Sequence, residues 1–413
     1  MNTKLNINKS KKSIYFAFIW HGFFLALTMS MLDLNTVFPS LISKLSNSKL
    51  LFASLYSIML GVPLIFNIIF SHFLKKYKRK KKFLLLGIYL RAISFLGMAF
   101  FTYRFSVNNP NLTIISFYFW VFLFSISAGF AGISYADIIG KLLPSKDRTQ
   151  LYASKQFFSS IAAFGGGLLV SKIFGLKNLL FPLNYSVNLF IGFIGLVIAS
   201  IGFILIKEPD SEIKESTSSS FFSYLKEVPI YLKNDLHFRK FIIVENMASF
   251  SIMLLPFYII FAKEHFNIDK SFIGKYLMFQ IIGTILSNIV WGYLAKKHSS
   301  KQIVNVCIRL GGIIPLLAII LSFFGPNVYS LLFFLIGFIL SGRRIGFEPY
   351  LLDIAPSNRR TEYLGIRGSL NIFVVLLPIF GSIVINLFGF YFTFILVSIV
   401  MLSASVILKK DTH

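Results

Sequence analysis

The chain has 413 residues, of which 56% are hydrophobic and only 14% are charged, and its formal net charge is +25. A soluble domain averages about 25% charged residues. Hydrophobic runs of about 20 residues recur along this chain, and each can cross a bilayer core of roughly 30 Å. These features exclude a soluble globular protein and predict an all-α polytopic membrane protein. The single cysteine, Cys307, excludes an internal disulfide, and neither a metal site nor a cofactor is expected.

Twelve membrane-spanning helices are predicted in chain order. A typical span of about 23 residues rises about 35 Å, enough to cross the bilayer with some tilt. The predicted spans are 14–36, 50–74, 83–104, 112–142, 151–173, 183–206, 238–262, 271–295, 302–324, 328–352, 362–386 and 389–408.

Positive charge is concentrated on one side of these spans. The segment 75–82, between the second and third spans, contains seven Lys or Arg in eight residues. With the N-terminus inside, the cytoplasmic segments and inner span ends hold 30 of the 41 basic residues, and the outer segments hold 7. We therefore expect both termini in the cytoplasm, location in the cytoplasmic (inner) membrane, and contact between segment 75–82 and anionic membrane lipids. A nucleic-acid partner is not expected, because no soluble domain carries this charge.

A polar central stretch divides the chain into three predicted parts. They are an N-terminal six-helix half at 1–206, a cytoplasmic linker at 207–237, and a C-terminal six-helix half at 238–413. The linker carries the Ser-rich sequence KEPDSEIKESTSSS and then FFSYLKEVPIYLK. The latter fits either a short amphipathic helix in the membrane interface or a loosely packed loop.

The two halves share sequence patterns. After Leu74 and after Leu294, lysines are followed by an apolar helix, and each helix carries an arginine, Arg91 or Arg309, about 15 residues after the leucine. The pattern P-S-x-x-R-T follows the fourth and tenth spans and aligns Arg148 with Arg360. Two independent matches at similar offsets indicate an internal repeat.

Twelve spans, two six-helix repeats, a central linker and basic inner loops resemble the major facilitator superfamily over nearly the whole chain. The family signature G-x-x-x-D-R-x-G-R-R is degenerate here, with Ser71 at the first glycine and Lys75 at the aspartate. The second copy keeps Gly292 but has Lys296 at or beside the aspartate position. In the family, that aspartate helps to latch the inner gate, so the resemblance leaves this latch in question.

The resemblance implies a secondary transporter, not an enzyme, that moves a small solute by alternating access and is usually monomeric. Proton coupling and facilitated diffusion both stay open. The fifth span lacks the G-P pair of the family's antiporters, which argues against a drug–proton antiporter. A lipid, amphiphile or drug translocase on the same fold, and a membrane sensor that does not transport, are the alternatives.

In this family spans 1, 4, 7 and 10 line the transport path, which directs attention to their polar residues. Glu245 and His21 occupy matching depths in spans seven and one, and Asp33 lies near the outer end of span one. We consider all three as substrate or coupling candidates. The alternatives are a Glu245 paired near the inner interface, a His21 that only packs, and an Asp33 solvated at the outer rim.

Charged clusters are predicted at the inner ends of spans four and ten. They either break and re-form as inner-gate salt bridges or anchor the loops at the headgroups. Arg344 and Glu348 are four residues apart and are expected to pair. Arg91 and Arg309 are expected to be structural residues inside the membrane, although contact with substrate is the other possibility. The predicted inner-gate residues are Asp137, Arg148, Arg344, Glu348, Asp353 and Arg360.

Overall fold

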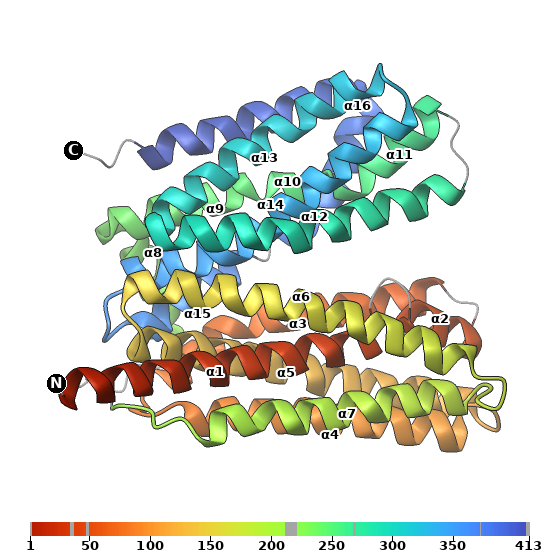
Figure 1. Cartoon of the computed structure of the whole chain (residues 1–413), viewed down its shortest axis with the longest axis horizontal. Coiled ribbons are helices and arrows are strands. Elements are labelled where there is room, and N and C mark those ends of the chain that lie inside the picture. Colours follow the sequence, from red (N-terminus) through yellow and green to blue (C-terminus); the bar gives the residue numbers. More distant parts are fainter. Residues whose placement is uncertain are drawn as a thin grey trace. The chain divides into compact units, whose positions relative to one another are not determined.

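The computed structural model describes residues 2–33, 37–46, 49–210, 221–266, 270–371 and 373–409. Every regular element in these ranges is an α-helix, which confirms the all-α prediction (Figure 1). Eleven helical segments of the described chain are long and apolar enough to cross a membrane. The helices are α1 (Asn2–Met31), α2 (Val37–Leu45), α3 (Lys49–Leu74), α4 (Lys81–Phe105), α5 (Pro110–Leu142), α6 (Ser145–Gly175), α7 (Leu183–Ile204), α8 (Phe221–Asn234), α9 (Leu236–Ala248), α10 (Phe250–Met253), α11 (Leu255–Phe266), α12 (Lys270–Lys297), α13 (Ser300–Ser322), α14 (Pro326–Ile354), α15 (Arg360–Leu370) and α16 (Phe373–Lys409).

The last two predicted spans meet at a glycine turn inside α16. Gly389 has φ 80° and ψ 172°, a conformation that favours glycine, and it separates two helices that are joined under one label. The part after Gly389 matches the predicted span 389–408. The predicted span 362–386 falls on α15 and the first part of α16, and residue 372 within it lies outside the described residues.

Two predicted boundaries differ from the structure in an informative way. α6 begins at Ser145, six residues before the predicted span 151–173, so Arg148 lies on a helix and not in a loop. In the predicted linker, FFSYLKEVPIYLK forms α8, which is the helical alternative of the two that the sequence allowed.

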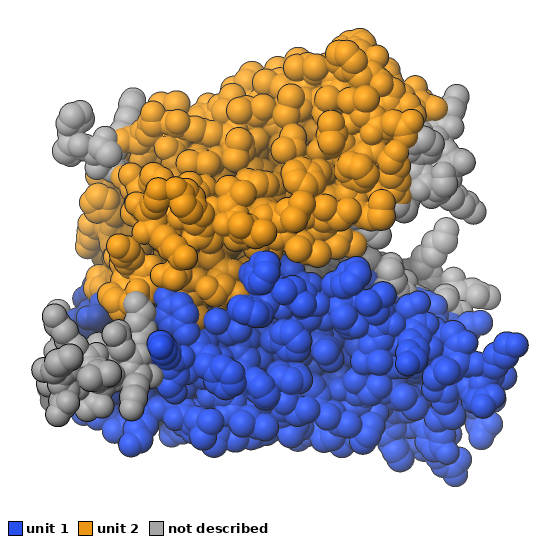
Figure 2. Space-filling model, viewed as in Figure 1, with its two compact units in different colours: residues 1–143, 157–216, 357–369 blue, residues 144–156, 217–356, 370–413 orange. Residues whose placement is uncertain are grey.

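The chain divides into two compact units (Figure 2). Unit 1 comprises residues 1–143, 157–216 and 357–369, and unit 2 comprises 144–156, 217–356 and 370–413. Each unit thus includes a short segment from the other half of the sequence, namely the start of α6 in unit 2 and most of α15 in unit 1. The three-part division at 207–237 stays a prediction.

The two units use the same pattern of helix pairing. In unit 1, α5 packs against α3 and α4, and α7 packs against α4 and α1. In unit 2, α14 packs against α12 and α13, and α16 packs against α13, α9 and α10. Because the partners correspond in chain order, the internal repeat inferred from the sequence is also a repeat in three dimensions.

The abundant phenylalanines fill the interior of each unit. The side chains of Phe38, Phe95 and Phe117 in unit 1 are completely buried. In unit 2 the ring of Tyr276 stacks on Phe333 with a centroid distance of 4.5 Å. Such close ring packing provides the van der Waals contact that holds membrane helices together, since the surrounding lipid offers no hydrophobic driving force.

Candidate functional site

The seventh predicted span is interrupted one turn after Glu245. α9 ends at Ala248, and the backbone N–H and hydroxyl of Ser249 both donate to the carbonyl oxygen of Glu245, at 3.0 and 2.8 Å. Glu245 itself is only 3% exposed. Pro256, the second residue of α11, follows a second break at Leu254, which fits a proline's tolerance for the first turn of a helix. The structure therefore places this carboxylate in a buried position beside broken helical backbone.

Arg343 of α14 holds the broken end of α9. Its Nη1 donates to the carbonyl oxygen of Ala248 at 2.7 Å, and its Nη2 donates to the hydroxyl of Ser249 at 3.0 Å. The guanidinium also lies over the ring of Phe347, 4.9 Å from its centroid. A cation at a helix C-terminus satisfies the last carbonyls and the negative end of the helix dipole. Arg343 thus places a positive charge within one turn of Glu245.

The structure corrects the expected pairing of Arg344 with Glu348. Arg344 is exposed and makes no ion pair with Glu348 in the described part of the chain. The Glu348 carboxylate accepts a hydrogen bond from the hydroxyl of Tyr152 at 2.7 Å instead. The i, i+4 spacing predicted a pair between Arg344 and Glu348, but it is the neighbouring Arg343 that makes hydrogen bonds to another helix.

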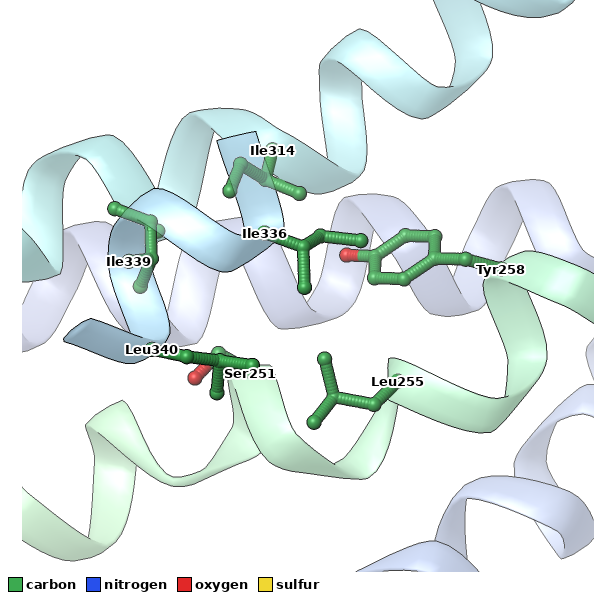
Figure 3. A pocket seen from close by; sticks show the side chains of 8 residues that line it. Ser251, Leu255, Tyr258, Ile314, Ile336, Ile339 and Leu340 are labelled. Carbon is green, nitrogen blue, oxygen red and sulfur yellow. The ribbon is translucent and has the colours of Figure 1, made fainter. Parts of the chain in front are cut away.

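A small cavity lies beside the interruption of the seventh span, inside unit 2 (Figure 3). Its volume of about 20 Å³ is enough for one water molecule and far too small for a solute. The Tyr258 ring reaches toward it, and Ser251 faces it from the other side (Figure 3). The hydroxyl of Ser251 already donates to the carbonyl oxygen of Ala248 at 2.8 Å. This cavity lies beside the helix interruption and is too small to be a substrate site.

His21 and Asp33 have different surroundings. His21 is 4% exposed, packs against the rings of Phe203 and Tyr135, and has its Nδ1 3.4 Å from the carbonyl oxygen of Ala199. Asp33 is half-buried just after α1, and its carbonyl oxygen accepts from the N–H of Phe38. Neither residue belongs to a group of three metal-binding side chains, and no such group occurs among the described residues.

Asp137 belongs to a buried network of charges in unit 1. Its carboxylate pairs with Lys80 and Lys141, both at 2.9 Å. Lys141 also pairs with Glu208 at 2.6 Å, and Glu208 accepts from the backbone N–H groups of Lys80 and Lys81 at the start of α4. Burial lowers the pKa of Lys80, and Asp137 opposes that shift. Part of the basic segment 75–82 therefore faces the protein interior, where Glu208, which sequence reasoning missed, balances it.

Lys75 pairs with the first turn of α15. Its Nζ lies 3.2 Å from Oε1 of Glu362, and each side chain is 10% exposed. Two glycines allow α15 to approach α3 this closely. A Cβ added at Gly365 would lie 2.1 Å from the Cβ of Ser71, and one at Gly368 would lie 2.0 Å from the side-chain nitrogen of Asn67.

The start of α6 makes a comparable contact in unit 2. Arg148 donates through Nη1 to the carboxylate of Asp353 and to the carbonyl oxygen of Leu352, both at 2.9 Å. The other carboxylate oxygen of Asp353 accepts from Ser300 at 2.5 Å. Its repeat counterpart Arg360 is 5% exposed and lies against α5 in unit 1, where a Cβ at Gly140 would be 2.5 Å from Arg360 Nε. The two predicted clusters thus hold the segments that extend into the other half's unit.

The repeat-related arginines Arg91 and Arg309 differ in their hydrogen bonding. Arg309 donates through Nε to the hydroxyl of Ser405 at 2.9 Å, and Ser405 in turn donates to Asn305 at 2.7 Å. Arg91 lies over the ring of Phe124, 5.5 Å from its centroid, and its buried Nε has no hydrogen-bond partner in the described part of the chain. The structure thus agrees with a structural role for Arg309 and leaves that of Arg91 open.

Comparison with known proteins places this geometry in a family. The family model for the Major Facilitator Superfamily matches residues 19–244 and 241–412. Among solved structures, FucP, a fucose:proton symporter of E. coli, superposes with a TM-score of 0.79 at 14% identity, covering 98% of this chain and 100% of FucP.

A bacterial homologue of the iron transporter ferroportin gives a TM-score of 0.75 at 14% identity, covering 96% and 98% of the two chains. The human organic anion transporter MFSD10 gives 0.70 at 13% identity, covering 97% and 99%. The sequence finds no match among curated proteins. At these identities the solved structures share the fold alone, whereas the family model covers both repeats. The chain therefore belongs to the Major Facilitator Superfamily.

Proposed function

We propose that this protein is a secondary transporter that carries a small solute across the cytoplasmic membrane by alternating access, with no enzymatic step. Both termini lie in the cytoplasm, lipids surround the helices, and the working unit is a monomer. The observation that carries the proposal is the family match over both repeats, together with the shared helix-pairing pattern of the two units. Binding between two such repeats that rock about a central site is the family's mode of transport.

The inner gate is proposed to consist of the segments 144–156 and 357–369. The segment 144–156 lies in the N-terminal half of the sequence but packs in unit 2, and the segment 357–369 lies in the C-terminal half but packs in unit 1. Arg148–Asp353 holds the first segment, and Lys75–Glu362 holds the second. Since a rocking movement has to separate such segments in one of its two states, both ion pairs must break and re-form in the cycle. Lys75 stands where the family has an aspartate, so in the proposed latch the lysine is on this loop and the carboxylate, Glu362, is on its partner.

Glu245 is proposed to carry the coupling proton or to contact the solute. The carboxylate is buried, and the helix carrying it is broken one turn later, where Arg343 supplies a compensating charge. Buried ionisable groups in membrane helices are expensive and usually serve transport or proton transfer. Asp33 and His21 stay as secondary candidates, and the ring contacts of His21 favour packing over chemistry.

The test is solute flux in proteoliposomes. Solutes that raise the melting temperature of the purified protein are selected from sugars, amino acids, organic acids, drugs and lysolipids. We expect an inward proton gradient to drive uptake of a selected solute, and Glu245→Gln to abolish that uptake while leaving exchange of labelled for unlabelled solute. Equal gradient-driven uptake by the variant would remove Glu245 from coupling.

The same experiment distinguishes the alternatives. Movement of labelled lipid without solute flux would establish a translocase, and binding without any flux would establish a sensor. The related proteins are named as a fucose:proton symporter, a homologue of an iron transporter and an organic anion transporter, and these names do not select a substrate class for this chain.

A further inference from the structure

We propose that the interruption of the seventh span in unit 2 is a cation-binding site that the chain fills with its own Arg343, and that this arginine closes the site to metal ions. The ligand class is a small monovalent cation, and guanidinium is the closest match to the group that occupies the site. The consequence is that coupling through Glu245 needs no sodium ion. This consequence rests on the proposed function, whereas the site itself rests on local geometry.

The site exists because a backbone carbonyl has lost its helical partner. In a continuous helix the carbonyl oxygen of Ala248 would accept from the N–H of Ile252, four residues later. Here that N–H donates to the carbonyl oxygen of Ser249 at 2.9 Å, so the oxygen of Ala248 is left at the end of α9. Carbonyl groups at a helix C-terminus carry the negative end of the helix dipole and therefore favour a cation.

Two oxygen acceptors at this helix end face the same cation. The carbonyl oxygen of Ala248 accepts from Nη1 of Arg343 at 2.7 Å, and the hydroxyl oxygen of Ser249 accepts from Nη2 at 3.0 Å. That hydroxyl donates its own hydrogen to the carbonyl oxygen of Glu245 at 2.8 Å, so it presents lone pairs to the guanidinium. The buried Glu245 adds negative charge one turn earlier. Broken membrane helices use such oxygen groups at their ends to bind ions.

The depth of the site explains why its cation is part of the chain. Arg343 lies eleven residues before the end of α14 at Ile354, which is about 17 Å along the helix axis. A charge that far into a bilayer core of roughly 30 Å is costly without a partner. The guanidinium and the oxygen groups of α9 offset this cost for each other. The ring of Phe347, 4.9 Å from the guanidinium, supplies a further contact.

Room for a free cation lies close to the same carbonyl. Ser251 donates to the carbonyl oxygen of Ala248 at 2.8 Å and also lines the cavity of about 20 Å³ (Figure 3). This cavity can hold one water molecule or an ion of similar size. Removing the Arg343 side chain beyond its Cβ enlarges that room and leaves the two oxygen acceptors without their cation. We expect a small cation from solution to enter in its place.

The test measures melting temperatures of the purified wild type and Arg343→Ala in choline chloride at fixed ionic strength. Na⁺, methylguanidinium, or urea as an uncharged planar counterpart is then added. In choline we expect Arg343→Ala to melt on the order of 5 °C below the wild type, because its helix end has no cation. Na⁺ or methylguanidinium should restore about half of this difference or more, and urea should restore none. The melting temperature of the wild type should not rise with any of the three.

Three further variants make the result specific. Arg344→Ala removes the neighbouring arginine of α14, which is exposed, and should melt like the wild type. Arg309→Ala removes a guanidinium that donates to the hydroxyl of Ser405 and not to a helix end, so Na⁺ should not restore its stability. Arg343→Gln keeps a donor without the charge and should respond to the cations as Arg343→Ala does. It provides the same measurement where the alanine variant fails to fold.

Several outcomes would overturn the proposal. They are an Arg343→Ala protein as stable as the wild type, recovery by neither cation, equal recovery by urea, recovery of Arg309→Ala by Na⁺, and a rise in the wild-type melting temperature with Na⁺. Any of these results together with proton-driven flux would end this inference and leave the transporter intact. Sodium-driven uptake by the wild type would refute the consequence for coupling. The expected melting behaviour without flux of any solute would keep the site and refute the transporter.

Discussion

At the residue scale, the most informative side chain is Lys75. The family signature has an aspartate at this position, and a lysine there reverses the sign of the charge. The partner is reversed as well, since Glu362 lies in the first turn of α15, 3.2 Å away. A carboxylate in the first turn of a helix is favourable in itself, because it faces the positive end of the helix dipole. Lys75 therefore meets a carboxylate that the helix already stabilises.

Exchanging the two charges of this pair tests the interaction. Lys75→Glu alone places two carboxylates together with little solvent, and we expect a loss of about 3 kcal/mol in unfolding free energy, read as a lower melting temperature. Lys75→Glu with Glu362→Lys should recover more than half of the loss. Arg79→Ala is the control, since the Arg79–Asp210 pair is 67% and 57% exposed and should contribute little. A double variant no better than the single would show that the two residues are energetically independent.

At the scale of the element, glycines of α15 allow this helix to pack closely against α3. The approach leaves no room for a side chain at Gly365, which faces Ser71 on α3. Closely packed small residues of this kind are how membrane helices gain contact. The same helix carries Glu362 and Arg360, so its docking and its ion pairs are expected to form and break together.

A single methyl group tests this docking. Gly365→Ala should displace α15 from α3 and lower both the melting temperature and the rate of transport, because the closed gate no longer packs. Gly167→Ala on α6 is the matched control, since an added Cβ there meets nothing within 4 Å. Alanine is the better helix former, so the control should be neutral or slightly stabilising. If both variants behave alike in the melting experiment, close packing at Gly365 contributes nothing.

At the scale of the whole molecule, the distribution of basic residues makes a prediction about orientation. The ratio of 30 to 7 between the two sides places both termini in the cytoplasm. A green fluorescent protein fused after His413 should fluoresce, and alkaline phosphatase at the same place should be inactive. Phosphatase inserted in the segment 106–109, between α4 and α5, should be active. The reverse result at both places would invert the topology and move both proposed gate segments to the outer side.

The sequence by itself determined the membrane class, the twelve predicted spans, the repeat and the family, because hydropathy, helical length and loop charge are local properties that a chain carries wherever it folds. The repeated P-S-x-x-R-T pattern and the nearby charges also drew attention to Arg148, Asp353 and Glu348, whose assignment to an inner gate stays a prediction.

Only the tertiary structure decided which charges meet. Neighbouring residues on a helix point about 100° apart, so Arg343 reaches α9 while Arg344 stays exposed, a difference that spacing alone could not resolve. Lys75 finds its carboxylate 287 residues away, on a segment that packs with the other half's unit. Arg309 donates to Ser405, whereas the Nε of Arg91 has no hydrogen-bond partner among the residues that the structure describes, although the sequence presents the two arginines as equivalents. Such long-range pairing depends on helix rotation and packing, which no local pattern encodes.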